Sequence, residues 1–400
     1  MRAVGWAFCI IGLAICLKFT AAYRAVGSDF MQDYAAATAL RSGFPIYGDS
    51  IQQIIDQTVP GNWHIANNHP PSTALLFLPF SVLPYPIAFV ALNILSLLIV
   101  TAMVVASFRN IPINPKLLPL ALGFCFCWYP VIYCLGTGQS SVLIAGCITF
   151  GWLSLKRGGQ RSAGVLFGIA ALFKLFPGII ALYLIAQRRF TSLSWMISAF
   201  TLGVFLSVLI GGVEPWSEYV HQIIASDMEQ WNAFVLNVSI CGFIERLIGA
   251  KTAWVEPLVE LPLIARTLQL IVQAGLIMWL AATLNKIKGD QGVGFSLTTV
   301  LMLLISPIMW AHMFPVLIYP VLLLIALQTG PKKRNDLIAV LLIVALLSIP
   351  DVLLARFLMS FYLPNHMPWY TALLLTGQTI GLLLLLCKFS AASRDSLEIV

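Results

Sequence analysis

The chain has 400 residues, of which 60% are hydrophobic and 10% are charged, and its formal net charge is +7. Together with a mean hydropathy of +0.91, this composition excludes a water-soluble globular protein and indicates a membrane protein. The positive charge is divided among short loops between apolar runs, which is typical of cytoplasmic membrane loops and not of a nucleic-acid-binding surface.

Long apolar runs recur along the chain, and a run of about 18 or more residues can cross the hydrocarbon core of a membrane. Two shorter helices that turn at Pro177 are expected within residues 161–187, and residues 70–84 form either a short span or a helix that dips partway. The sequence therefore predicts one all-α, multi-pass membrane domain over residues 1–400, with about twelve transmembrane helices. The longer spans are expected near residues 4–22, 86–107, 117–134, 139–155, 191–212, 263–284, 293–307, 311–329, 335–350 and 368–387.

The first apolar run, MRAVGWAFCIIGLAICLKFTAA, has a basic start and ends in small residues. These features are also typical of a cleavable signal peptide. Because Lys18 interrupts the apolar part and many spans follow, we favour a retained first transmembrane helix. Either interpretation leaves residues 27–47 on the extracytoplasmic side.

The distribution of charge predicts which loops face the cytoplasm. Basic residues such as Lys156, Arg157 and Arg161 gather in short loops, which marks the cytoplasmic side. The acidic residues gather in two longer loops, at residues 23–69 and 213–262, whose Trp and Tyr residues favour short helices at the membrane interface. We therefore expect an extracytoplasmic site, and a short C-terminal tail at residues 389–400.

The first long loop contains GSDFMQDYAAATALRSGFPIY, residues 27–47. If its alanine-rich part is helical, Asp29 and Asp33 lie four positions apart on one face. Acidic residues are common in the first helical turn, where the helix dipole favours them, so a purely structural role is the alternative. Both carboxylates are nevertheless candidate functional groups.

Other polar residues at membrane depth are candidates because such positions are costly. Lys174 follows an apolar helix at its non-basic end, and it either snorkels to the interface or faces a phosphate. His69 precedes Pro70 and Pro71, which favour the start of a helix, so it either caps that helix or forms hydrogen bonds in a cleft. Gln139 follows a glycine turn and either binds a ligand or caps the next helix.

The candidates in the second half of the chain interrupt apolar stretches. An arginine at such a place can bind a phosphate through two parallel hydrogen bonds. A helix break at membrane depth is tolerated where it lines a cavity or is buried in protein, which draws attention to ISPIMWAHMF, residues 305–314. These candidates are Asn237, Ser239, Arg246, Trp310 and His312.

The order of these motifs resembles glycosyltransferase family 87, a family of integral membrane mannosyltransferases with the GT-C fold. The motifs are DF-x-x-x-Y, L-x-x-G-x-P-x-Y, PP, GQ, AG-x-x-x-G-x-A-A-x-x-K-x-x-P, N-x-S and SP-x-x-W-x-H, between about residues 28 and 320. The resemblance implies a polyprenyl-phosphate sugar as donor, with mannose as the expected sugar, and a site on the extracytoplasmic face.

The resemblance also implies roles for individual residues. Asp29 matches the family aspartate and would act as general base, and Lys174 matches the family lysine and would hold the donor phosphate. Asp33 would bind sugar hydroxyls, although it stands where many relatives have tyrosine and either aspartate remains a candidate base. Where many relatives have asparagine after GQ, this chain has Ser140. Substrate-binding positions are matched by His69, Gln139, Asn237, Ser239, Arg246, Trp310 and His312.

The sequence thus predicts an inverting membrane glycosyltransferase of the cell (plasma) membrane, without a cofactor or metal. Its expected partners are a polyprenyl-phosphate sugar, a glycan or glycolipid acceptor and membrane lipid, but not nucleic acid. A lipid-linked-sugar flippase or transporter and a GT-C glycan ligase are the alternatives. The donor sugar, the acceptor, the linkage and the oligomeric state are left open.

Overall fold

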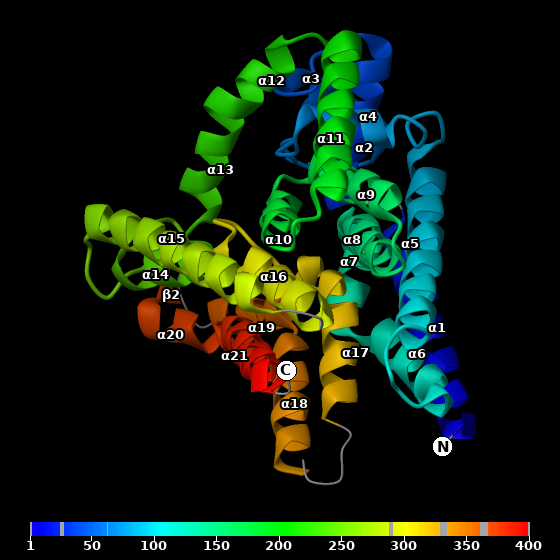
Figure 1. The fold of residues 1–400 in the computed structure, drawn as a ribbon. Helices are drawn as coiled ribbons and strands as arrows, with labels where there is room; N and C mark the ends of the chain where they lie inside the picture. Colours follow the sequence, from blue (N-terminus) through cyan, green and yellow to red (C-terminus); the bar gives the residue numbers. More distant parts are fainter. Residues whose placement is uncertain are drawn as a thin grey trace. The chain divides into compact units, whose positions relative to one another are not determined.

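The computed structural model describes residues 2–24, 28–61, 63–287, 291–328, 334–360 and 367–398. Most of these residues are helical (Figure 1), and they divide into two compact units. The first unit comprises Met1–Gly178 and Phe190–Ala225, and the second comprises Ile179–Arg189 and Ser226–Val400. The prediction of one integrated domain stays a prediction.

The first unit contains both the predicted long N-terminal loop and the lysine motif. Its helices are α1 (Arg2–Tyr23), α2 (Asp29–Ser42), α3 (Asp49–Thr58), α4 (Pro71–Phe77), α5 (Tyr85–Phe108), η1 (Pro115–Leu117), α6 (Leu118–Cys127), α7 (Tyr129–Thr137), α8 (Ser141–Lys156), α9 (Gln160–Phe173), α11 (Phe190–Gly211), α12 (Glu214–Glu218) and η3 (Tyr219–Ile223). The short helix η2 (Phe176–Ile179) follows the lysine motif and continues the chain into the second unit.

Helices α9 and α11 pack closely because glycines face α11. A Cβ atom on Gly164 would clash with the carbonyl oxygen of Ser192, and one on Gly168 would lie 2.6 Å from the carbonyl oxygen of Met196. Two small residues four positions apart allow the backbones of membrane helices to approach in this way. The Gly/Ala pattern before Lys174 therefore serves helix packing.

An aromatic cluster anchors the start of α2. Phe30 is fully buried, and its ring lies 5.7 Å from those of Phe77 and Tyr85, measured between centroids. Tyr85 also shares a 3.0 Å hydrogen bond with the Ser28 hydroxyl. Since such rings bury much apolar area, this cluster holds the backbone on both sides of Asp29.

The second unit contains the C-terminal half of the chain together with one short helix from the middle. Its elements are α10 (Ile180–Ala186), α14 (Ile240–Ile248), β1 (Val255–Glu256), α15 (Pro262–Lys286), α16 (Gln291–Ile305), η4 (Ala311–Leu317), α17 (Ile318–Leu327), α18 (Arg334–Leu347), α19 (Asp351–Met359), β2 (Met367–Pro368), α20 (Trp369–Leu374) and α21 (Gly377–Glu398). Helix α13 (Ile224–Trp231) begins in the first unit and ends in the second.

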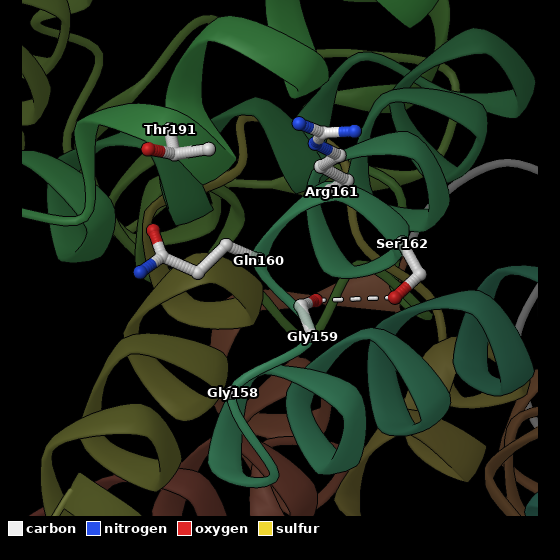
Figure 2. Close-up of a pocket in the computed structure, with 6 residues that line it drawn as sticks. All are labelled: Gly158, Gly159, Gln160, Arg161, Ser162 and Thr191. Atoms are coloured by element: carbon white, nitrogen blue, oxygen red, sulfur yellow. Dashed lines mark hydrogen bonds between the residues drawn. The ribbon is translucent and has the colours of Figure 1, made fainter.

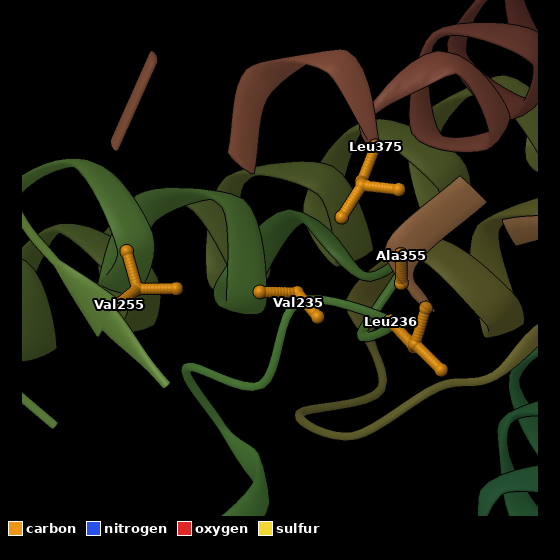
Figure 3. Packing of buried hydrophobic residues seen from close by; sticks show 5 residues of the cluster. All are labelled: Val235, Leu236, Val255, Ala355 and Leu375. Atoms are coloured by element: carbon orange, nitrogen blue, oxygen red, sulfur yellow. The ribbon is translucent and has the colours of Figure 1, made fainter. Parts of the chain in front are cut away.

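A small apolar cluster joins distant segments of the second unit (Figure 3). Val235 and Leu236, from the segment before α14, pack with Val255 of β1, Ala355 of α19 and Leu375. Strands β1 and β2 pair in parallel, with Val255 opposite Met367. The sequence patterns did not predict this two-stranded sheet.

Among the described residues, four helices are long and apolar enough to cross a membrane, or up to six if each of two bent helix pairs counts as one span. The chain is therefore a multi-pass membrane protein. The bent pairs are α6 with α7 and α18 with α19, and shorter apolar helices accompany them. The total of about twelve spans stays a prediction.

Some predicted segment bounds need correction. The candidate span within 70–84 is wrong, because α4 has only seven residues and rises only about 10 Å. The expected span at 368–387 is two helices, α20 and α21, separated at Leu375 and Thr376. The tail predicted at 389–400 is helical through Glu398, because α21 continues that far.

Candidate active site

Three of the predicted site residues form one hydrogen-bonded chain in the first unit. The side-chain amide of Gln139 donates from Nε2 to Oδ2 of Asp29 at 2.8 Å. Its Oε1 atom accepts from Nζ of Lys174 at 3.4 Å. Because a carboxylate accepts and an ammonium only donates, the amide has a single satisfying orientation. A candidate base and a candidate phosphate-binding cation are thus held on either side of one amide.

The turn between α7 and α8 places Gln139 beside α2. Gly138 adopts a left-handed conformation with φ of 67°, and it ends α7. A Cβ atom at this position would lie 2.6 Å from Cβ of Phe30 and 2.8 Å from the ring of Phe89. Only glycine satisfies both the backbone conformation and the close approach. The predicted glycine turn is confirmed at Gly138.

The hydroxyl groups at the start of α4 cap the end of α9 next to Lys174. Ser72 Oγ donates to the carbonyl of Leu172 at 2.7 Å, and Thr73 Oγ1 donates to that of Phe173 at 2.9 Å. These carbonyls belong to the last turn of α9, where helices leave acceptors unpaired. Lys174 itself is extended, with φ of −152° and ψ of 143°. The two expected short helices are present as α9 and α10, but the chain turns at Lys174 and Leu175, and Pro177 lies within η2.

The environment of Asp29 favours its protonated form more than water does. Part of its surface is reachable by solvent, but the surrounding protein desolvates the group and raises the pKa of the carboxyl. The hydrogen bond from Gln139 and the charge of Lys174 oppose this rise and lower the pKa. A carboxyl with a raised pKa is a stronger proton acceptor once ionised, which suits a general base.

Asp33 and His69 form a separate buried pair. Oδ1 of Asp33 lies 2.6 Å from Nδ1 of His69, and the two residues are 1% and 8% exposed. If Asp33 is ionised, it can only accept, so Nδ1 of His69 must carry a proton. In a neutral imidazole ring, Nε2 is then free of a proton and can accept a hydrogen bond. This geometry ties Asp33 to the histidine, whereas the sequence predicted that Asp33 binds sugar hydroxyls.

The backbone of His69 is also held in place. The Tyr47 hydroxyl donates to the carbonyl of His69 at 2.7 Å, and Oδ1 of Asn67 accepts from its amide at 3.2 Å. Nδ2 of Asn67 donates to the carbonyl of Ile46 at 2.9 Å. The supporting roles of Tyr47 and Asn67 were not predicted, although both residues lie in or next to stretches that contain predicted site residues.

In the second unit, Asn237 joins two loops. Its Nδ2 atom donates to the carbonyls of Asn232 and Pro307 at 2.9 and 2.8 Å. Its Oδ1 atom accepts from the amides of Ser239 and Met309, each at 3.1 Å. These four bonds use the two donors and two acceptor positions of the amide. The geometry therefore gives Asn237 a structural role, and the predicted substrate contact stays a prediction.

Ser239 has a comparable position at the start of α14. Its hydroxyl accepts from the amide of Gly242 at 3.0 Å, as an N-cap does, and donates to the carbonyl of Pro307 at 3.1 Å. Ser239 is fully buried. The serine thus fixes the start of α14 and the same loop that Asn237 holds.

Arg246 is 3% exposed, and burial lowers the pKa of its guanidinium to about 10. Its Nη1 atom donates to the carbonyls of Phe234 and Asn237 at 3.0 and 2.8 Å. Within the part of the chain that the structure describes, no carboxylate forms an ion pair with it. Arg246 is therefore a buried cation supported by main-chain oxygens.

Trp310 and His312 lie together at the predicted helix break. Their rings are stacked, with centroids 6.4 Å apart. The ring of Trp310 also packs against those of Phe234 and Trp231, with centroid distances of 5.2 and 5.8 Å. Trp231, Phe234 and Trp310 are each partly exposed, whereas His312 is buried. The structure thus brings Trp310 and His312 into one aromatic cluster.

The N-terminal end of α9, opposite the end that Lys174 follows, carries the basic residue Arg161 (Figure 2). A pocket of about 370 Å³ lies at the turn before α9, lined by residues that include Gln160, Arg161 and Thr191. Ser162 Oγ donates to the carbonyl of Gly159 at 3.1 Å there. Since α9 has 14 residues, this basic end lies about 21 Å from Lys174.

Comparison with known proteins agrees with these motifs. The model of glycosyltransferase family 87 matches residues 68–307, which is more than half of the chain. This range includes His69, which pairs with Asp33, and it also includes Gln139, Lys174 and Asn237.

Two mycobacterial enzymes are similar to the chain. A polyprenol-phosphate-mannose-dependent alpha-(1-2)-phosphatidylinositol mannoside mannosyltransferase of Mycobacterium tuberculosis is 25% identical over 354 residues, covering 82% of this chain and 75% of the relative. A polyprenol-phosphate-mannose-dependent alpha-(1-2)-phosphatidylinositol pentamannoside mannosyltransferase from another strain is 29% identical over 220 residues, covering 52% and 46%. The chain is therefore a membrane glycosyltransferase, and it belongs to glycosyltransferase family 87.

Proposed function

We propose that this glycosyltransferase transfers one mannosyl residue from a polyprenyl-phosphate donor to a glycan or glycolipid acceptor. The names of both mycobacterial relatives support this donor and a phosphatidylinositol mannoside acceptor. The proposal includes the GT-C architecture, the plasma membrane and an extracytoplasmic site. The orientation is supported by the basic residues at the far end of α9, since short basic loops face the cytoplasm.

The observation that carries the proposal is the chain Asp29–Gln139–Lys174. It holds a carboxylate and an ammonium group at the two ends of a single amide. Glycosyl transfer from a phosphate donor needs these two functions, a proton acceptor for the acceptor hydroxyl and a cation for the leaving phosphate. The proposed roles therefore follow from the chemistry of the two groups and from their arrangement.

In the proposed reaction, the acceptor hydroxyl oxygen attacks the anomeric carbon, and the bond from that carbon to the phosphate oxygen breaks. The bonding electron pair leaves with the polyprenyl phosphate, whose additional negative charge Lys174 stabilises. Asp29 takes the hydroxyl proton. A single displacement inverts the configuration at the anomeric carbon.

The remaining candidates have supporting roles in this proposal. Asp33 orients His69 through its 2.6 Å contact, which allows Nε2 of the histidine to accept a hydrogen bond from a sugar hydroxyl. Arg246, Trp310 and His312 contact substrate. Asn237 and Ser239 hold the loops that carry them, because their own hydrogen-bonding groups are already engaged.

The test uses membranes that contain the protein, radiolabelled polyprenyl-phosphate mannose, and either endogenous acceptors or phosphatidylinositol mannoside. The wild type is expected to transfer label, and Asp29→Asn is expected to lower the rate by roughly 10²–10⁴-fold. Asp49→Asn is a matched control, because Asp49 is also the first residue of a helix in the same loop but is exposed.

The outcomes separate the alternatives. Full activity in Asp29→Asn together with loss in Asp33→Asn would reverse the assignment of the base. Transfer of a preassembled glycan without turnover of the monosaccharide donor would favour a glycan ligase. Movement of labelled lipid across vesicles without sugar transfer would overturn the proposed reaction.

A further inference from the structure

A second pocket lies in the first unit, at the C-terminal ends of α2 and α11. Its volume is about 390 Å³. One wall is the turn after α2, with Phe44 and Pro45, and the other is the end of α11 together with Glu214 and Glu218 of α12. No lysine, arginine or histidine is among its lining residues.

Local sequence explains the first wall. Gly43 has a φ of 74° and ends α2, and the amide of Phe44 donates to the carbonyl of Ala39 at 2.9 Å. This left-handed helix cap turns the chain sharply. The turn leaves the Phe44 side chain 59% exposed beside Pro45. An aromatic surface is thus available at the pocket.

The second wall presents carboxylates. Glu214 and Glu218 are four residues apart in the short helix α12, so they lie on one face. Among the described residues, neither forms an ion pair. Two carboxylates that no ion pair neutralises repel phosphate groups. The pocket is therefore unsuited to the donor phosphate and to anionic lipid headgroups.

A neutral sugar fits these walls. Its hydroxyl groups can donate to the two carboxylates, which only accept hydrogen bonds when ionised. Its C–H face can pack against the ring of Phe44. Apolar walls with a few polar groups are typical of ligand pockets, in which the polar groups orient the ligand. A mannosyl residue without charge offers both features.

The position of the pocket indicates which sugar it holds. Helix α2 begins at Asp29 and ends beside the pocket, and its 14 residues rise about 21 Å. The reacting sugar lies at Asp29 in the proposed function, so a sugar in the pocket is several rings away. We propose that the pocket binds a distal sugar of an elongated acceptor glycan, an inference that rests on the proposed function.

The test compares two synthetic acceptors that share the reacting mannose, one a monomannosyl lipid and the other an oligomannosyl lipid. The ratio of kcat/KM for the long acceptor to that for the short acceptor is measured for wild type, Phe44→Ala and Glu214→Gln/Glu218→Gln. Each variant is expected to lower this ratio about tenfold through the KM of the long acceptor, which corresponds to about 1.4 kcal/mol. Phe190→Ala is the matched control, because Phe190 is 58% exposed and lies away from the pocket lining.

A ratio equal to that of the wild type, or an equal loss with both acceptors, would overturn the proposal. If the wild type transfers mannose to neither acceptor, the proposed function itself fails, and binding of free oligomannose then tests the pocket directly. Binding that the double glutamine variant loses would support a glycan site. Absence of binding to the wild type would exclude it.

Discussion

The Nε2 atom of Gln139 donates to Oδ2 of Asp29 at 2.8 Å, although the two residues are 110 positions apart in the chain. The bond does more than position the carboxylate, because a hydrogen bond to the ionised form also lowers its pKa. Burial acts in the opposite direction and raises it. The protonation of Asp29 therefore depends on a glutamine in a different loop.

Replacing Gln139 by leucine should shift the acidic limb of the pH–rate profile to higher pH. The change removes a contribution that lowers the pKa of Asp29 and leaves the desolvation that raises it. Since only ionised Asp29 can accept the proton, activity would be lost at a higher pH as the solution is acidified. The profile of kcat/KM against pH measures this shift, and an unmoved limb would contradict the role of Asp29 as base.

Lys174→Met should lower kcat by roughly 10²–10³-fold, because a cation that faces the leaving phosphate acts mainly in the transition state. Lys174→Arg keeps the charge and should retain part of the activity. Lys156→Met is the control, since Lys156 ends α8 and its Nζ donates to the carbonyl of Asn110. Steady-state kinetics with varied donor would test this, and a Lys174→Met enzyme with the wild-type rate would remove the lysine from the mechanism.

Gly138→Ala should destabilise the protein by about 2–4 kcal/mol, from an unfavourable positive φ and overpacking against Phe30. Gly43→Ala provides the comparison, because Gly43 also ends a helix with positive φ but has no atom within 4 Å of its Cβ position. It should cost only about 1 kcal/mol. Thermal unfolding in detergent measures both, and equal losses would show that the contact with Phe30 is unimportant.

Asn237→Asp should destabilise the protein although the two side chains have nearly the same shape. A carboxylate can still accept from the amides of Ser239 and Met309, but it cannot donate to the carbonyls of Asn232 and Pro307. The carbonyl of Pro307 keeps its bond from the Ser239 hydroxyl, so the expected cost is that of two lost hydrogen bonds, about 1–3 kcal/mol in total. An unchanged unfolding temperature with a raised KM would instead indicate that Asn237 binds substrate.

Local chemistry made several features of the fold predictable. Pro71 is the first residue of α4, Gly138 ends α7, and Lys174 follows the last residue of a short apolar helix. Each of these depends on neighbouring residues alone, through a fixed φ, a left-handed conformation or an apolar run. The family resemblance from the motifs was confirmed by the match over residues 68–307.

Features that depend on distant segments were not predictable in the same way. Hydropathy measures apolar content over a window and does not detect a bend. The sequence therefore predicted one span where α6 and α7 meet at a 50° bend at Trp128, and one span where α20 and α21 are separate. The sequence presented Asp33 and His69 as separate candidates, because no pattern reports a contact between residues 36 positions apart. The bridging role of Gln139 was hidden for the same reason.

The length of α9 has a consequence for how a lipid-borne substrate reaches Lys174. The helix rises about 21 Å, whereas the hydrocarbon core of a membrane is about 30 Å thick. If the basic end of α9 lies at the cytoplasmic surface, as in the proposed function, a helix along the membrane normal would place Lys174 below the opposite headgroups, at the depth of the acyl chains. A polyprenyl phosphate could then reach the lysine by sideways diffusion within its own leaflet, while a hydroxylated acceptor approaches from the aqueous side.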